Sequence, residues 1–190
     1  INDTHPNFRL ISLSVGDSEM KQVEEIIAPS DDCFLDQGSF FNDFFVIESQ
    51  VKGLNKIDFY RYNSGHFHTL NFPDDVYSAH LSENYEWETD TVRYKYSSLK
   101  TAPQTLEYEL KTQKTNVLKV KDVPHFNSND YECQRLWAKA HDGKDIPISI
   151  LKKKENKGPA PLVLYGYGAY GVNIDPSFDD EVLPLVDRGF

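Results

Sequence analysis

The chain has 190 residues, enough for one domain or two partial ones. Hydrophobic residues make up 39% of it and aromatic residues 13%, which is typical of a globular β-rich protein and excludes a disordered chain. The net charge of −10 at pH 7 argues against a general nucleic-acid binder, and no apolar run approaches the length that spans a membrane.

The first two-thirds of the chain contain a repeat with a shift of about 48 residues. This shift places Phe-Phe-Val-Ile-Glu-Ser at 44–49 on Val-Arg-Tyr-Lys-Tyr-Ser at 92–97. Each unit has four strand-like runs, rich in aromatic and β-branched residues and separated by Asn, Asp, Gly or Pro. The first unit covers roughly residues 33–72 and the second roughly 76–121.

Two further runs, at 8–15 and 22–28, precede these units and look like the last two strands of an earlier unit. Four strands at a spacing of about 45 residues are typical of a β-propeller blade. The pattern therefore predicts a mostly β chain with about two and a half four-stranded blades. An ordinary β-sandwich with coincidental spacing is the alternative.

After Pro124 the repeat fails, and residues 127–130 look like a linker. Runs at 131–141 and 146–151 predict a β-hairpin across the Asp142–Gly143 turn. The short apolar run at 162–165 predicts a third strand, covered on both faces.

A helix is predicted over residues 177–187, with Ser177 as its cap, acidic residues in its first turn and Gly189 beyond its end. Pro184 falls inside this range, so the helix should be kinked there or split. A hairpin, a strand, a glycine-rich loop and a helix together form the opening of an α/β domain.

The glycine-rich loop after the third predicted strand is the main candidate site. It contains three glycines, which permit backbone conformations closed to other residues, and two tyrosines that should project at the carboxyl end of the strand. These residues are Gly166, Gly168, Gly171, Tyr167 and Tyr170.

This loop has three interpretations. It matches the GxGxxG dinucleotide fingerprint formally, but Asn173, Asp175 and Pro176 intervene before any helix, and bulky tyrosines stand where pyrophosphate should meet bare backbone. It could also be a structural turn whose tyrosines pack in a core. Thirdly, it could be the loop of an α/β-hydrolase that supplies an oxyanion donor, because a phenol is a neutral donor at pH 7. One such donor contributes about 3–4 kcal/mol of transition-state stabilisation.

The chain resembles the prolyl oligopeptidase family of serine peptidases, and within it the oligopeptidase B branch. The resemblance covers essentially the whole chain. Six segments carry it: residues 89–99 (Thr-Asp-Thr-Val-Arg-Tyr-Lys-Tyr-Ser-Ser-Leu), 135–138 (Arg-Leu-Trp-Ala), 142–149 (Asp-Gly-Lys-Asp-Ile-Pro-Ile-Ser), 165–171 (Tyr-Gly-Tyr-Gly-Ala-Tyr-Gly), 174–176 (Ile-Asp-Pro) and 185–190 (Leu-Val-Asp-Arg-Gly-Phe).

The resemblance implies a seven-bladed propeller that caps an α/β-hydrolase domain and admits only short, unstructured peptides. Residues 1–126 would be the last propeller blades, and 127–190 the first strands and helix of the catalytic domain. Tyr167 matches the family's oxyanion-hole tyrosine, and Tyr170 matches an aromatic position of the substrate pocket. Prolyl oligopeptidases usually have Gly-Gly-Phe-Asn where this chain has Gly-Ala-Tyr-Gly at 168–171, which favours the branch that cleaves after Lys or Arg.

None of the serines lies in a GxSxG motif, and by the resemblance the family's Ser, Asp and His would follow Phe190. We therefore interpret the chain as a piece of a longer serine endopeptidase and expect it to be inactive alone, since acyl transfer needs a nucleophile and its base. A non-catalytic propeller that binds peptides or partner proteins is the alternative function.

The remaining expectations concern cofactors and compartment. His66 and His68 alternate on a predicted strand and should share a face, but no third metal ligand lies nearby, so we expect neither a metal nor a cofactor. Cys33 and Cys133 are far apart in the sequence, which favours reduced thiols over a disulfide framework. We expect a cytoplasmic protein, with organellar targeting by a segment upstream of Ile1 left open.

Overall fold

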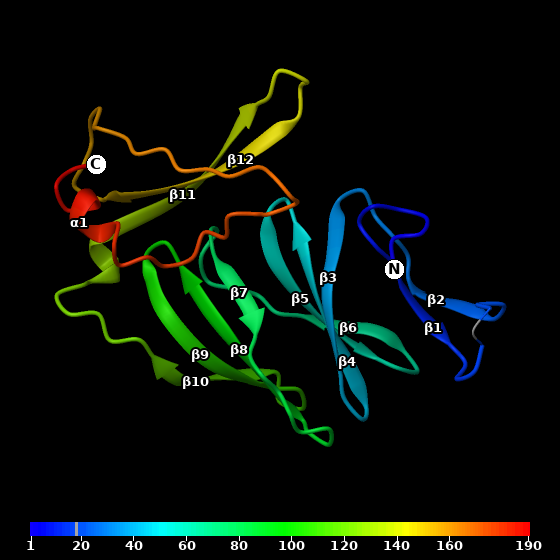
Figure 1. The fold of residues 1–190 in the computed structure, drawn as a ribbon. Helices are drawn as coiled ribbons and strands as arrows, with labels where there is room; N and C mark the ends of the chain where they lie inside the picture. Colours follow the sequence, from blue (N-terminus) through cyan, green and yellow to red (C-terminus); the bar gives the residue numbers. More distant parts are fainter. Residues whose placement is uncertain (18) are drawn as a thin grey trace. The chain divides into compact units, whose positions relative to one another are not determined.

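The computed structural model describes residues 1–17 and 19–190 (Figure 1). It divides into two compact units, one of residues 1–70 with 86–88 and one of residues 71–85 with 89–190. Antiparallel β-sheets dominate both units. Within the described ranges, no helix has the length and apolar character needed to cross a membrane.

The first unit contains a two-stranded and a four-stranded sheet. Its strands are β1 (Leu10–Leu13), β2 (Val23–Ile27), β3 (Cys33–Phe40), β4 (Phe44–Val51), β5 (Leu54–Arg61) and β6 (Gly65–Thr69). β1 pairs antiparallel with β2, and β3 to β6 lie side by side in chain order. The predicted four-stranded unit and the strand pair ahead of it are both present.

The second unit repeats this order in a second four-stranded sheet, followed by a hairpin and a short helix. Its elements are β7 (Ser78–Leu81), β8 (Thr91–Ser98), β9 (Thr101–Glu109), β10 (Lys114–Val120), the 3₁₀ turn η1 (Ser128–Asp130), β11 (Tyr131–Lys139), β12 (Asp145–Lys153) and α1 (Leu183–Val186). Two successive meanders of four strands agree with the predicted blades.

The two four-stranded sheets differ in how their strands are buried. In β4, six consecutive residues from Phe44 to Ser49 are buried, as expected of a strand covered on both faces. In β8, the buried Val92, Tyr94 and Tyr96 alternate with the exposed Arg93 and Lys95, and burial becomes continuous only at Ser97 and Ser98.

The turns that join the strands follow from local backbone chemistry. Lys52 and Gly53, between β4 and β5, have φ of 53° and 72°, the left-handed pair that a two-residue hairpin requires. The predicted hairpin after the linker is confirmed, because β11 and β12 pair over their whole length. Gly143 in its turn has φ of 84°, which favours glycine at that position.

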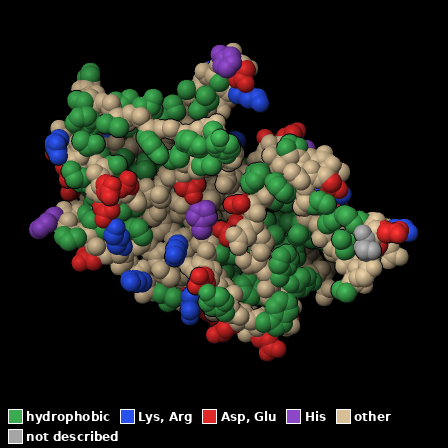
Figure 2. Space-filling view, in the orientation of Figure 1, with side chains coloured by type: hydrophobic (Ala, Val, Ile, Leu, Met, Phe, Trp, Pro, Cys, Tyr) green, Lys and Arg blue, Asp and Glu red, His purple; other side chains and the backbone are tan. Residues whose placement is uncertain are grey.

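The third strand predicted after this hairpin is not formed. Residues 162–165 have no regular structure, and Leu162 and Leu164 are 75% and 81% exposed. A strand needs a neighbour to take up its backbone hydrogen bonds. β11 and β12 pair with each other, and the described chain offers this run no further partner. Figure 2 shows hydrophobic side chains along this region and the adjacent hairpin.

The predicted helix over 177–187 is also corrected, because α1 covers only Leu183–Val186. The side chain of Asp179 accepts a hydrogen bond from the amide of Glu181, a local turn that competes with the helix. Ser177 is not its cap, since Val182 precedes the first turn and makes no side-chain capping bond. Pro184 therefore lies in the first turn, where its fixed φ is favourable, instead of interrupting the helix.

Helix α1 packs against the hairpin. Tyr131, Leu183 and Val186 form a small buried cluster, with partly buried apolar residues around it, among them Phe126 and Phe178. The Tyr131 hydroxyl donates to the Asp187 carboxylate at 2.7 Å, so the end of the helix is tied to the start of β11.

Candidate functional site

The glycine–tyrosine loop, residues 166–171, lies at the surface of the second unit. It contains a tight turn in which the amide of Val172 donates to the carbonyl of Ala169 at 3.1 Å. Tyr170 and Gly171 have φ of 57° and 69° in this turn. Glycine adopts this left-handed conformation freely, whereas for Tyr170 it costs on the order of 1 kcal/mol.

The two tyrosines of the loop are exposed and not packed in a core. The side chain of Tyr167 is 50% exposed and that of Tyr170 is 94% exposed. Within the described part of the chain, neither hydroxyl has a hydrogen-bond partner. The Tyr167 phenol is therefore available as a donor to a bound molecule.

The other two glycines of the loop are not explained by backbone conformation. Gly166 and Gly168 lie outside the left-handed region, and a Cβ added at either would meet open space. The expectation that all three glycines adopt conformations closed to other residues is thus met only by Gly171.

The segment after the loop is fixed to the β7–β10 sheet by Asp175. Its carboxylate accepts from Nε2 of His80 at 2.7 Å and from the hydroxyl of Ser78 at 3.2 Å, both on β7. The hydrogen bond from His80 is the main reason why the pKa of Asp175 lies below its usual value, and partial burial opposes this shift. The neighbouring Pro176 is buried.

Two further contacts follow along the same segment. The amide of Phe178 donates to the hydroxyl of Ser97 on β8 at 3.4 Å. Asp180 pairs with Nζ of Lys121, just after β10, at 2.7 Å. Residues 175–180, which we call the strap, therefore contact β7, β8 and Lys121, which directly follows β10.

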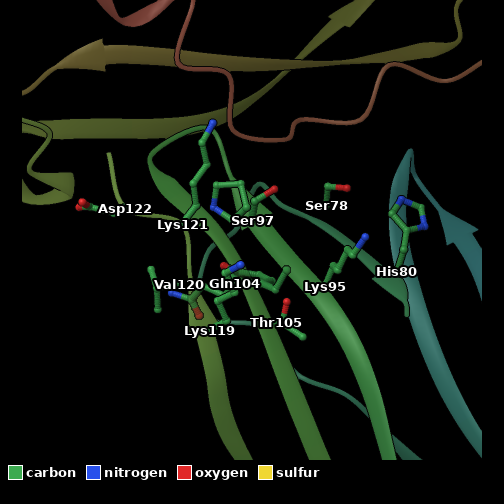
Figure 3. Close-up of a pocket in the computed structure, with 12 residues that line it drawn as sticks. Ser78, His80, Lys95, Ser97, Gln104, Thr105, Lys119, Val120, Lys121 and Asp122 are labelled. Carbon is green, nitrogen blue, oxygen red and sulfur yellow. The ribbon is translucent and has the colours of Figure 1, made fainter. Parts of the chain in front are cut away.

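A cavity of about 690 Å³ lies beside the strap, on one face of the β7–β10 sheet (Figure 3). A row of residues, with one or more from each of the four strands, lines this cavity. In this row His80 lies opposite Lys95, and Thr105 lies opposite both Lys95 and Lys119. In a chain with a net charge of −10, this row makes the cavity locally basic.

The structure separates the two histidines considered as metal ligands. The register of β5 and β6 shifts between Phe59 and Tyr60, so His68 lies opposite Phe59 and His66 opposite Tyr60. Neighbouring residues of a strand face opposite sides, so the two histidines do not share a face as expected. His66 instead contacts Asp58, with 3.3 Å between Nε2 and Oδ1.

Sequence reasoning missed the residues that anchor the strap. Asp175 appeared only as a residue between the loop and the predicted helix and as part of the Ile-Asp-Pro segment, and nothing marked Ser78 or His80. Their contact joins residues more than 90 positions apart, and no local pattern can reveal such a pairing.

Comparison with known proteins gives the chain its relatives. Residues 1–121 match the family model described as "Prolyl oligopeptidase, N-terminal beta-propeller domain". The dipeptidyl aminopeptidase BI of Pseudoxanthomonas mexicana is 32% identical over 98% of this chain and 26% of its own length. Protease 2 of Moraxella lacunata is 28% identical over 99% of this chain and 27% of its own length.

Solved structures agree with these relatives. Oligopeptidase B from Trypanosoma brucei, with covalently bound antipain, superposes with a TM-score of 0.78 and 30% identity over 87% of this chain and 25% of that chain. The chain thus spans about a quarter of the length of the curated relatives it matches.

Proposed function

Because the chain belongs to the prolyl oligopeptidase family of serine peptidases, we propose that it is part of an oligopeptidase that hydrolyses short peptides after Lys or Arg. In this proposal residues 1–126 belong to a propeller that limits access, and residues 127–190 begin the peptidase domain. The chain supplies one donor of the oxyanion hole, from Tyr167.

The exposed phenol of Tyr167 is the observation that carries this proposal. When a nucleophile attacks a peptide carbonyl, the carbonyl oxygen becomes negative and needs hydrogen-bond donors. The Tyr167 hydroxyl is a neutral donor, is half exposed on a loop, and is not engaged by another described side chain. It can therefore donate to a substrate oxygen without first breaking an internal bond.

The substrate class rests on the relatives and on the loop sequence. The oligopeptidase B of T. brucei holds covalently bound antipain, and residues 168–171 of this chain read Gly-Ala-Tyr-Gly instead of the Gly-Gly-Phe-Asn usual in prolyl oligopeptidases. Tyr170 is almost fully exposed beside Gly171, which leaves its ring accessible to the side chain of a bound peptide.

The test of the oxyanion role is Tyr167→Phe in the complete protein, with Tyr165→Phe as matched control. Both changes delete one exposed phenol hydroxyl from the same segment. Losing one oxyanion donor should lower kcat about 10²–10³-fold with little change in KM. Tyr165→Phe should leave both constants unchanged, and equal kinetics for the two variants would remove the role assigned to Tyr167.

Specificity is tested on the same complete protein with peptide amides that end in Arg, Lys or Pro. We expect turnover of the Arg and Lys amides and little of the Pro amide. Preference for Pro would overturn the assigned branch, and no turnover of any amide would favour a non-catalytic propeller that binds peptides.

A further inference from the structure

We propose that Asp175 is a positioning residue, which holds the glycine–tyrosine loop in place through its contact with Ser78 and His80 on β7. The structural part of this inference stands on the contact itself. Its catalytic part rests on the proposed role of Tyr167.

The contact is short, charged and partly buried. The Asp175 carboxylate lies 2.7 Å from Nε2 of His80 and also accepts a hydrogen bond from the Ser78 hydroxyl. Ser78 is buried, with 8% of its surface exposed. Asn173 adds a third, longer contact of 3.4 Å from its side-chain amide. Hydrogen bonds to a charged group are about twice as strong as those between neutral groups, so this point on the segment is well held.

Asp175 lies at the end of a long, weakly held segment. Between Lys157 and Val172, the hydrogen bonds of the described chain are confined to the turn from Ala169 to Val172. Tyr167 lies eight residues before Asp175. Without the contact, the segment that carries the loop would lose its hydrogen bonds to β7, and the loop would sample more conformations.

The same contact links the loop to the propeller part of the chain. Ser78 and His80 lie within the residues that match the propeller family model, whereas Asp175 and the loop lie outside that match. The position of β7 therefore fixes one end of the loop that carries Tyr167. A shift of this strand would be transmitted to the proposed oxyanion donor through the Asp175 carboxylate.

Hydrogen exchange of the complete protein tests the structural part. Asp175→Ala should speed amide exchange about tenfold in peptides covering residues 172–178, where the amides of Val172, Ser177 and Phe178 are hydrogen-bonded, and His80→Ala should do so to a smaller extent. Asp175→Asn keeps an acceptor oxygen and should fall in between. Peptides from β4 should be unaffected in each variant, which separates a local effect from general destabilisation.

The chain offers a matched control in His66→Ala. His66 also contacts an aspartate, Asp58, from a strand of a four-stranded sheet, but it belongs to the first unit, whereas the loop belongs to the second. Its replacement should leave exchange at residues 172–178 unchanged. If Asp175→Ala does not fold, His80→Gln and Ser78→Ala remove the two contacts singly. Exchange in these variants no faster than in His66→Ala would overturn the inference.

Kinetics of the same variants test the catalytic part. A displaced oxyanion donor should lower kcat about tenfold and leave KM nearly unchanged, with partial recovery in Asp175→Asn. Faster exchange with unchanged kcat would overturn the catalytic part and leave the structural part supported. If Tyr167→Phe leaves kcat unchanged while Asp175→Ala speeds exchange, only the proposed oxyanion role is overturned.

Discussion

Asp74 shows how single residues stabilise the second sheet. Its carboxylate accepts from the hydroxyls of Tyr96 at 2.7 Å and Thr101 at 2.8 Å, and pairs with Lys100 at 3.2 Å. Burial of this group acts to raise its pKa, but the hydrogen bonds outweigh it, and the pKa of Asp74 lies below the usual 3.8. The interaction thus favours the charged form in the folded state.

This shift predicts how stability depends on pH. A carboxyl group whose folded pKa is depressed stabilises the fold above its unfolded pKa, and this contribution is lost as pH falls through the folded pKa. Asp74→Asn should therefore lower the free energy of unfolding by about 1–3 kcal/mol at pH 7, and the difference should shrink below about pH 4.

Urea unfolding at pH 7 and pH 3 measures this difference. Asp75→Asn is the control, because Asp75 is the exposed neighbour of Asp74 and should change stability little at either pH. A destabilisation by Asp74→Asn that is equally large at both pH values would contradict the electrostatic explanation.

At the scale of the elements, the two four-stranded sheets are related but not identical. Val46 on β4 lies opposite Phe59 on β5, whereas Tyr94 on β8 lies opposite Leu106 on β9. A shift of 48 residues aligns β4 with β8, because it places Val46 on Tyr94. Strand β5 aligns with β9 at a shift of 47, because Phe59 corresponds to Leu106. A register irregularity between Tyr96 and Ser98 accounts for the difference.

The aromatic core of the first sheet should dominate its stability. Phe59 is fully buried and contacts the ring of Phe44, whereas Phe40, in the same sheet, is 50% exposed. Phe59→Ala should destabilise the fold by about 3–5 kcal/mol because it leaves a cavity, and Phe40→Ala should cost much less. Thermal unfolding of the two variants measures this contrast, and similar losses of Tm would contradict it.

At the scale of the molecule, the chain contains a proposed oxyanion donor but no GxSxG nucleophile. Hydrolysis through an acyl-enzyme needs a serine activated by a base, and an oxyanion donor alone cannot provide the attacking group. We therefore expect the proposed peptidase activity to need residues other than the 190 of this chain.

We predict that the purified 190-residue polypeptide does not turn over Lys- or Arg-amide substrates, under conditions in which the complete protein does. A fluorogenic amide assay, with the complete protein as positive control, measures this. Turnover that copurifies with the 190-residue chain and is lowered by Tyr167→Phe would show that the chain contains a nucleophile, and would overturn the prediction.

Local signals in the sequence were sufficient to predict most of the strands. Alternating aromatic residues and turn residues at a regular spacing placed the strands from β3 to β10, because a meander pairs each strand with its neighbour in the chain. The hairpin of β11 and β12 followed from Asp142–Gly143 for the same reason. The role of Tyr167, which the family motif predicts, stays a prediction.

Features that depend on distant partners emerged only from the folded chain. The run at 162–165 has the composition of a strand but no strand beside it, and its backbone stays irregular. The helix at 183–186 is shorter than the helix predicted over 177–187 with Ser177 as its cap. The turn made by the Asp179 side chain and the position of Pro184 in the first helical turn explain the difference. The contact of Asp175 with Ser78 and His80 depends on two segments far apart in the chain meeting in space, which composition and periodicity do not encode.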